Sequence, residues 1–247
     1  YDLKLKNYKH MKIGYFLKKG VYYCVNKPII IEEPALQRME TAIPGWLEKG
    51  HLYCFDYAIK NLPNDNPIVE IGTFLGLSTN TILYYLNKHG KKNKLITTDW
   101  FRKDIPADEK ICNVANPELF RSYLKEGFVR NVRFFNPQAE IASADLPSDD
   151  FFAAWQAGKE LTNLFGGSFS PKGEISFAYI DGNHQYDYAK RDFENVDKIL
   201  VPGGFILFDD SADYTNWGSK IVAQEAVKTG RYKIIKKNPH YFVQKVK

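Results

Sequence analysis

The feature that most constrains the fold is a buried strand signature, Ile175–Ile180, followed at once by a helical pattern. The strand segment is almost entirely apolar, which is typical of a central parallel strand that is covered on both faces. The apolar residues after it advance by three or four positions, which is the spacing of one helical face: Tyr186, Ala189, Phe193, Val196, Ile199 and Leu200. A buried strand joined to an amphipathic helix is the repeating unit of a parallel α/β sheet.

The same alternation extends along most of the chain. Further strands are predicted at Pro67–Ile71, Lys94–Thr98 and Phe205–Phe208, with a weaker one at Val132–Phe135. Helices are predicted between them, at Leu77–Lys88, Pro117–Lys125, Phe151–Leu161 and Ser219–Thr229. Two last strands, Tyr232–Ile235 and Tyr241–Val246, flank Asn238-Pro239 and predict a C-terminal antiparallel hairpin. We therefore expect an α/β fold with a mainly parallel sheet and helices on both faces.

Residues 1–45 lie outside this alternation and are predicted to form an N-terminal helical extension. A helix is expected from Tyr8 to Lys19, and Lys27-Pro28 breaks the pattern. The first 27 residues contain seven lysines and one acid, which we interpret as a solvated amphipathic segment. No nucleic-acid motif accompanies these lysines, so no nucleic-acid partner is expected. The domain boundary is placed between residues 45 and 46.

Cysteine usage and hydropathy narrow the class of protein further. The three cysteines, Cys24, Cys54 and Cys112, are far apart and form no C-x-x-C motif, which argues against a thiolate zinc site and favours reduced thiols in the cytoplasm. No apolar run approaches the roughly 20 residues of a membrane span, so no membrane partner is expected. The sequence leaves the oligomeric state open and is compatible with a homo-oligomer.

A glycine-bearing turn, Glu70–Ser78, connects the strand at 67–71 to the helix at 77–88. Gly72 permits a tight turn and a close approach of the backbone to a ligand. Gly76 stands where the helix begins, so that free N–H groups nearby can face polar ligand atoms. Asp99 follows the next strand, 29 residues after Glu70, where its carboxylate can accept the hydroxyl protons of a ribose. We predict that this region binds a nucleoside.

The predicted nucleoside site has eight members: Glu70, Gly72, Thr73, Phe74, Gly76, Ser78, Asp99 and Trp100. Trp100 and Phe101, which follow Asp99, are interpreted as a cover for an adenine ring, with ordinary packing as the alternative. The spacing G-x-x-x-G-x-S differs from the G-x-G-x-x-G of dinucleotide enzymes and lacks the glycine that admits a pyrophosphate. The turn therefore favours a ligand without a pyrophosphate, and an NAD(P)-dependent oxidoreductase is the alternative.

Acidic residues follow two later strands of the pattern. Asp181 comes after the strand at 175–180, and Asp209-Asp210 follow the strand at 205–208. If these strands are neighbours, about 4.8 Å apart, three carboxylates gather at one end of the sheet. Such a cluster needs a compensating proton or cation, and oxygen ligands suit Mg²⁺ or another hard divalent ion.

His184 is the histidine nearest to these acids in the sequence. It has two interpretations, as a base that takes a proton from an acceptor hydroxyl or as a residue that orients its loop. The other histidines, His10, His51, His89 and His240, are interpreted as structural or exposed.

Together these motifs resemble the class I S-adenosylmethionine-dependent methyltransferases of the macrocin O-methyltransferase and cephalosporin hydroxylase type. The similarity covers about residues 40–245 and rests on four blocks: Glu70–Ser78, Asp99, Tyr179–Asp192 and Leu200–Asp210. Ile43–Leu47 also resembles the segment that leads into the domain in bacterial members. The resemblance implies a Rossmann-like, seven-stranded sheet with a terminal hairpin. It implies S-adenosylmethionine as cofactor and methyl transfer to a hydroxyl of a small molecule, often a sugar in a natural-product pathway. A nucleoside-binding relative without methyltransferase activity is a further alternative.

The resemblance also implies roles for the acids and for His184. Asp181, Asp209 and Asp210 match the three acids that hold a divalent metal, and His184 or Asp181 would assist deprotonation of the acceptor. Sugar O-methyltransferases of this type carry an acid two residues after the first metal aspartate. Asn183 stands at that position here and cannot take a proton. The base and the acceptor class are therefore left open. Separately, because residues 1–45 lie outside the core pattern, they are expected to act as a lid.

Overall fold

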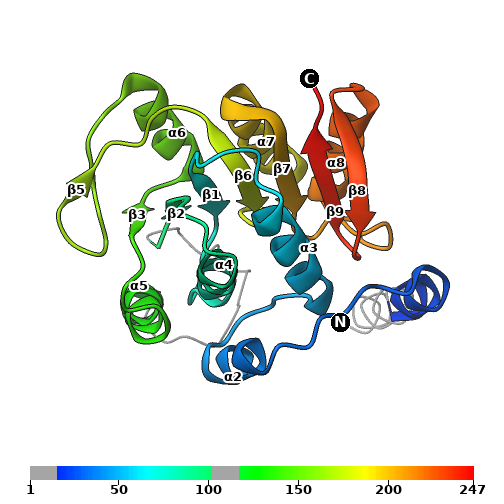
Figure 1. The fold of residues 1–247 in the computed structure, drawn as a ribbon, viewed down its shortest axis with the longest axis horizontal. Helices are drawn as coiled ribbons and strands as arrows, with labels where there is room; N and C mark the ends of the chain where they lie inside the picture. The colour runs from blue at the N-terminus through cyan, green and yellow to red at the C-terminus, as the bar shows by residue number, and fades with distance from the viewer. Residues whose placement is uncertain (1–15, 102–116) are drawn as a thin grey trace, which may run out of the picture.

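A seven-stranded sheet forms the centre of the computed structural model, which describes residues 16–101 and 117–247. Its strand order is β3-β2-β1-β6-β7-β9-β8 (Figure 1). The first five strands in this order run parallel, and β9 is antiparallel to both β7 and β8. The strands are β1 Ile68–Ile71, β2 Leu95–Asp99, β3 Ile141–Asp145, β6 Ile175–Ile180, β7 Leu200–Phe208, β8 Tyr232–Lys237 and β9 Tyr241–Lys245. The predicted α/β fold with a C-terminal antiparallel hairpin is confirmed.

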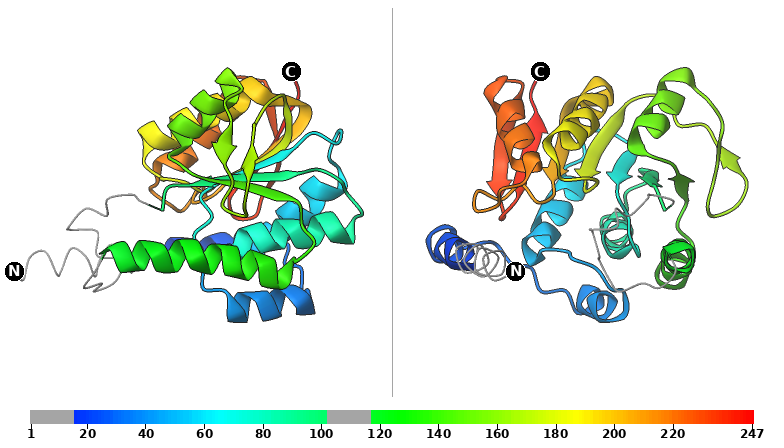
Figure 2. Two further views of the ribbon diagram at one scale, coloured as in Figure 1. Left: turned by 90° about the vertical axis from the view of Figure 1, so that its left-hand side faces the viewer. Right: turned by 180° about the vertical axis from the view of Figure 1, so that it is seen from behind.

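Helices cover both faces of the sheet (Figures 1 and 2). One layer contains α3, α4 and α5, with α2 packed outside α4, and the other contains α6, α7 and α8. Their bounds are α2 Pro34–Ala42, α3 Lys49–Lys60, α4 Leu77–Lys88, α5 Pro117–Phe135, α6 Ser148–Ala157, α7 Tyr186–Ile199 and α8 Gly218–Lys228. A separate two-stranded hairpin, β4 Leu161–Thr162 and β5 Ser168–Phe169, lies beside β3.

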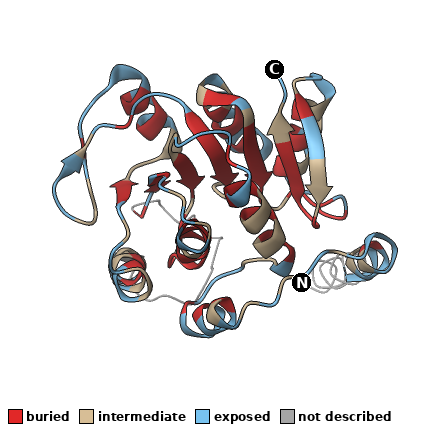
Figure 3. Cartoon of the chain, in the orientation of Figure 1, coloured by how far each residue is buried: buried red, intermediate tan, exposed pale blue. Residues whose placement is uncertain are grey.

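The sheet divides the hydrophobic core into two halves, because successive side chains of a strand point to opposite faces. In β6, Phe177 and Tyr179 pack with the α2–α5 layer, whereas Ala178 and Ile180 pack with the α6–α8 layer. All six residues of β6 are buried, as the continuous apolar signature predicted (Figure 3). Packed helix layers therefore cover the sheet on both faces and hold the parallel strands, with their carboxyl ends, in place.

The predicted third strand is wrong, because Val132–Phe135 forms the last turn of α5. These residues have high strand propensity, but they continue a helical face on which Leu124, Phe128, Val132 and Phe135 pack against the core. Burial of this face outweighs the local preference. The third strand is instead β3, whose sequence IASAD has only one large apolar residue and gave a weak signal.

The N-terminal extension is helical where the structure describes it. Residues 16–26 form a helix that ends before Lys27, as the break at Lys27-Pro28 predicted. Most of the helix expected at Tyr8–Lys19 lies outside the described residues. The short helix α2 follows, and it was not predicted individually. None of the helices in the described part of the chain is long and apolar enough to cross a membrane.

Candidate functional site

A cavity of about 620 Å³ opens at the carboxyl ends of the parallel strands. Residues at the carboxyl ends of four neighbouring strands line this cavity: Gly72 directly after β1, Asp99 as the last residue of β2, Asp181 directly after β6 and Asp209 directly after β7. Ligands of open α/β sheets bind at this edge. The opposite wall consists of the segment Pro44–Glu48, part of α5 and the start of α6. The predicted nucleoside turn and the predicted acid cluster thus lie in one cavity.

The turn after β1 fits tightly against the segment after β6. Gly72 has a φ of +85°, and a Cβ added to it would lie 2.1 Å from the carbonyl oxygen of Asp181. Only glycine tolerates both conditions. The Asp181 N–H donates to the carbonyl of Ile71 at 2.9 Å, and the Gly72 N–H donates to the carbonyl of Thr98 at 2.9 Å. The backbone itself therefore fixes the distance between the nucleoside turn and the first acid.

Asp99 closes this turn from the neighbouring strand. Its Oδ2 accepts hydrogen bonds from the backbone N–H groups of Thr73 and Phe74, at 2.7 and 2.8 Å, and from the Thr73 hydroxyl at 3.1 Å. Burial raises the pKa of Asp99, while these donors oppose the shift. Because the donors converge on one oxygen, Oδ1 is the atom that remains for a ligand in the cavity.

Glu70 and Gly76 shape the turn from behind and do not line the cavity. The fully buried carboxylate of Glu70 accepts hydrogen bonds from Ser78 Oγ at 2.5 Å and Thr79 Oγ1 at 2.6 Å. It thereby links the end of β1 to the first turn of α4. Burial raises the pKa of Glu70 to about 7, against the effect of the two hydroxyls. The other predicted nucleoside residues line the cavity: Gly72, Thr73, Phe74, Ser78, Asp99 and Trp100.

The acids lie together because β6 and β7 are parallel neighbours, with Ile180 beside Phe208. Asp181 and Asp209 share a side-chain hydrogen bond, and burial together with Asp209 raises the pKa of Asp181 well above its ordinary value. Asp181, Asp209 and His184 each offer a ligand atom, and these atoms lie within 4.8 Å of one another. Asp210, the third predicted metal ligand, places Oδ2 3.2 Å from His184 Nε2.

The loop after β6 positions His184 at the cavity wall. Its ring packs beside Trp217, with 5.7 Å between centroids, and its Nε2 faces Asp210. Asn183 also lines the cavity, but its Oδ1 accepts the N–H of Gln185 at 2.9 Å. This amide therefore stabilises the loop. His184 and Asp210 form a histidine–carboxylate pair in which the acid can orient the ring.

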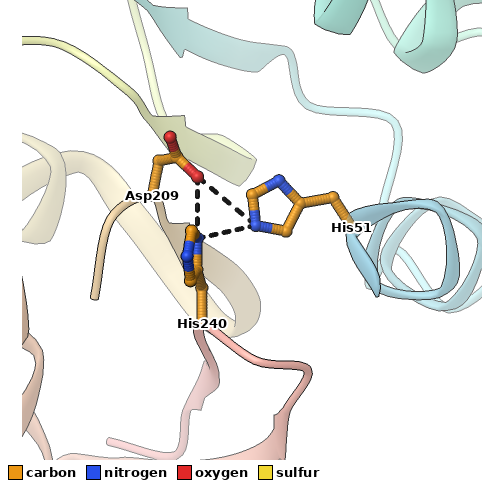
Figure 4. A group of neighbouring side chains, drawn as sticks. All are labelled: His51, Asp209 and His240. Atoms are coloured by element: carbon orange, nitrogen blue, oxygen red, sulfur yellow. Dashed lines mark hydrogen bonds and ion pairs between the residues drawn. The ribbon is translucent and has the colours of Figure 1, made fainter. Parts of the chain in front are cut away.

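Two residues beside the acids, His51 and His240, were interpreted as structural or exposed and are both buried. His240 Nδ1 lies 2.7 Å from Asp209 Oδ1 and 2.9 Å from His51 Nε2 (Figure 4). Burial lowers the pKa of His51 to about 4. For His240 burial also favours the neutral ring, but Asp209 raises its pKa above the ordinary value. The two histidines are 189 positions apart, so no spacing signal could have joined them.

Glu48 is a further cavity residue that the sequence pattern did not indicate. It forms an ion pair with Lys19, and the hydroxyl of Tyr23 donates to its Oε2 at 3.1 Å. Both partners belong to the helix at residues 16–26. The N-terminal extension is thus in contact with the cavity wall.

Comparison with known proteins gives a family match over most of the site. A family model described as a methyltransferase domain matches residues 69–211. An uncharacterized protein of Acanthamoeba polyphaga mimivirus is 38% identical over 65 residues, which are 24% of this chain and 28% of that protein. The chain therefore matches only about a quarter of the length of this curated relative.

Solved structures with the same fold include several methyltransferases. An O-methyltransferase from Bacillus cereus in complex with SAH is 16% identical, with a TM-score of 0.52 over 92% of this chain and 96% of that one. The O-methyltransferase NovP is 15% identical, with a TM-score of 0.56 over 80% of each chain. CalS11, a TDP-rhamnose 3'-O-methyltransferase of calicheamicin biosynthesis, is 16% identical, with a TM-score of 0.51 over 87% and 96%. At these identities the likeness shows the fold.

Proposed function

The chain belongs to the class I S-adenosylmethionine-dependent methyltransferases, and from this premise we propose that it methylates a hydroxyl oxygen of a small molecule. One observation carries the proposal: the Gly72 turn and Asp99 share a single cavity with Asp181 and the His184–Asp210 pair. A cofactor site and a group able to accept a proton are therefore in reach of the same ligand volume. A sugar or polyol is the acceptor class that we favour, because Asn183 and Asp210 line the cavity beside His184 and offer polar groups to hydroxyls.

The nucleoside end of the cofactor is assigned to the strand ends of β1 and β2. Asp99 Oδ1 would accept a ribose hydroxyl, while Oδ2 keeps Thr73 and Phe74 in place. Trp100 is partly exposed beside Asp99 and would cover one face of the adenine. Gly72 brings the backbone close to the remainder of the cofactor, toward the acids. This orientation directs the methyl group to the acceptor side of the cavity.

The chemical step is a displacement at the methyl carbon. The acceptor oxygen forms a bond to this carbon, the carbon–sulfur bond breaks, and its electron pair remains on sulfur as S-adenosylhomocysteine leaves. The hydroxyl proton must go to a base. Since Asp210 faces Nε2 of His184, that nitrogen would carry the ring proton and Nδ1 would accept the new one. Asp181 is less suited to this role, because burial and the neighbouring Asp209 raise its pKa and favour the neutral carboxyl.

A divalent ion, Mg²⁺ in the first place, fits the Asp181–Asp209 pair. The half-buried carboxyl of Asp181 and the buried carboxyl of Asp209 share a hydrogen bond, and a cation can replace the proton between them. Asp181 and Asp209 would hold the ion, with Asp210 beside them. When bound, such an ion lowers the pKa of a coordinated hydroxyl. His184 and Asp210 still provide the acceptor of the proton.

The N-terminal segment 1–45, with the main domain at 46–247, is proposed to act as a lid. The contacts of Lys19 and Tyr23 with Glu48 support this role, because Glu48 belongs to the cavity wall. A closed lid would exclude water from the sulfonium group.

Ligand binding and turnover test the function directly. Calorimetric titration with S-adenosylhomocysteine should show one site, and NADH should not compete for it. Radiolabelled methyl groups from S-adenosylmethionine should then transfer to members of a panel of sugar nucleotides, polyols and phenols. Binding of NADH without binding of S-adenosylhomocysteine would contradict the proposal and support the oxidoreductase alternative.

The base and the ion are tested separately once an acceptor is known. His184→Gln should lower kcat by about 10²–10⁴-fold, with cofactor affinity unchanged. Treatment with EDTA and the variant Asp209→Ala test the ion. If both leave the rate unchanged, the ion has no part in the reaction.

A further inference from the structure

Three ligand atoms from distant parts of the chain meet in one group (Figure 4), and two of the residues, Asp209 and His240, line the cavity. The three atoms are His51 Nε2 from α3, Asp209 Oδ1 from the end of β7, and His240 Nδ1 from the residue before β9. The pairs are separated by 2.7 Å (Asp209–His240), 2.9 Å (His51–His240) and 3.4 Å (His51–Asp209). We propose that these three residues bind a divalent transition-metal ion of the zinc class.

The size of this triangle suits one ion. Metal–ligand bonds of about 2.0–2.2 Å place neighbouring ligand atoms about 3.0–3.4 Å apart, depending on whether the angle is octahedral or tetrahedral. The observed separations lie close to this range, and small rotations of the rings would open the shortest one. Binding would therefore require no movement of the backbone.

Hydrogen bonding alone does not explain the contacts of His240 Nδ1. The Asp210 N–H points at this nitrogen from 3.1 Å and requires its lone pair, whereas Asp209 Oδ1 at 2.7 Å requires a proton on it. One imidazole nitrogen provides either a lone pair or a proton. A cation would explain the mutual approach of Asp209 Oδ1, His240 Nδ1 and His51 Nε2, because each of these atoms contributes a lone pair; the Asp210 N–H would then turn to another acceptor.

His51 faces this group through one ring nitrogen. Its side chain is fully buried, and its Nδ1 has no hydrogen-bond partner among the described residues. All its polar contacts therefore run through Nε2, toward Asp209 and His240. A metal bond would satisfy Nε2, the ring nitrogen that faces this group, while Nδ1 lies outside the group.

Packing holds both histidines in place. The His51 ring lies edge-on to Phe55 and Tyr179, with centroid distances of 6.1 and 5.8 Å. His240 stands at the tip of the β8–β9 hairpin, which Asn238 secures by donating to the carbonyls of Ile29 and Gly50 at 2.8 and 2.9 Å. Ligands fixed in this way lose little entropy when an ion binds.

The donor set selects the class of ion. Two imidazoles with one carboxylate suit zinc and its neighbours in the first transition row, whereas Mg²⁺ prefers oxygen ligands and retains water. Asp209 and His240 line the cavity and His51 lies behind them, so an open coordination position would face the cavity. Asp209 is shared with the acid pair, but this site does not depend on methyl transfer or on Mg²⁺.

Titration of the apo protein with Co²⁺, a spectroscopic substitute for Zn²⁺, tests the proposal without an activity assay. Co²⁺ should bind at the site formed by His51, Asp209 and His240 with visible absorption bands. His51→Gln and His240→Gln should each weaken binding at least tenfold, while the matched control His89→Gln, which pairs with Asp56 on another surface, should not. Equal binding by all four proteins would overturn the site.

A second measurement uses the unmodified protein and covers the case in which a buried histidine variant fails to fold. X-ray absorption of the zinc-loaded chain should show two imidazole ligands, and a shell of oxygen atoms alone would overturn the assignment. Asp181→Asn separates the two ion sites. This variant should retain Co²⁺ binding, whereas loss of Co²⁺ in Asp181→Asn with retention in both histidine variants would assign the ion to the acids.

Discussion

Replacement of Gly72 by alanine tests whether the close contact between the Gly72 turn and the backbone of Asp181 maintains the shape of the candidate site. The new Cβ would lie 2.1 Å from the Asp181 carbonyl oxygen, where ordinary contact begins near 3.4 Å. The two segments must therefore separate by about 1.3 Å, the difference between these distances. Overpacking of this kind costs about 1–3 kcal/mol, and a left-handed alanine costs about 1–2 kcal/mol more. We expect a total loss of about 2–5 kcal/mol.

Gly90→Ala is the matched control, because Gly90 also has a positive φ, +61°, but nothing lies within 4 Å of its added Cβ. This control should lose only the conformational part, about 1–2 kcal/mol. Urea unfolding measures both variants, with the m-value checked for constancy. Titration with S-adenosylhomocysteine should show weaker binding for Gly72→Ala alone. A Gly72→Ala protein as stable as Gly90→Ala, with normal cofactor affinity, would refute the steric reasoning.

Two further predictions concern acids with different tasks. Asp99→Asn should weaken S-adenosylhomocysteine binding by about 10- to 150-fold, which is the equivalent of one hydrogen bond to a charged group. The control Asp145→Asn, at the matching position of β3, should bind S-adenosylhomocysteine normally. Equal affinities of the two variants in calorimetry would argue against the ribose contact. For Glu70 the folded-state pKa of about 7 lies above its ordinary 4.5, so the wild type should lose up to about 3 kcal/mol of stability as pH rises from 4.5 through 7. Glu70→Gln should abolish this slope in urea unfolding, and an unchanged slope would contradict the assignment.

The main elements of the fold could be predicted from the sequence where local pattern and burial agree. Ile175–Ile180 is the clearest case, because a strand buried on both faces must be apolar at every position that faces a helix layer. Val132–Phe135 failed because its strand propensity conflicts with the helical face that begins at Leu124. β3, with small residues in place of branched ones, offered too little signal to correct the mistake.

The candidate site was predictable to a similar extent and for a related reason. Residues that directly follow strands, such as Gly72, Asp99 and Asp181, could be grouped because parallel strands end at one edge of the sheet. Glu70 belongs to the same motif, yet the structure turns its carboxylate toward Ser78 and Thr79 and away from the cavity. The local sequence shows where a side chain stands relative to a strand or helix. It does not show which way the side chain points when two sets of hydrogen-bond partners are within its reach.

The sequence by itself determined the alternating architecture, the glycine-bearing turn after the first strand and the acids at the strand ends, because each depends on short spacings and on the fixed hand of strand–helix–strand units. Only the tertiary structure decided which groups surround Asp209. His51 arrives on α3 and His240 at a hairpin tip, and their contact requires the complete strand order, in which β9 inserts beside β7. Contacts between residues 189 positions apart depend on how whole layers pack, and no local pattern encodes that packing.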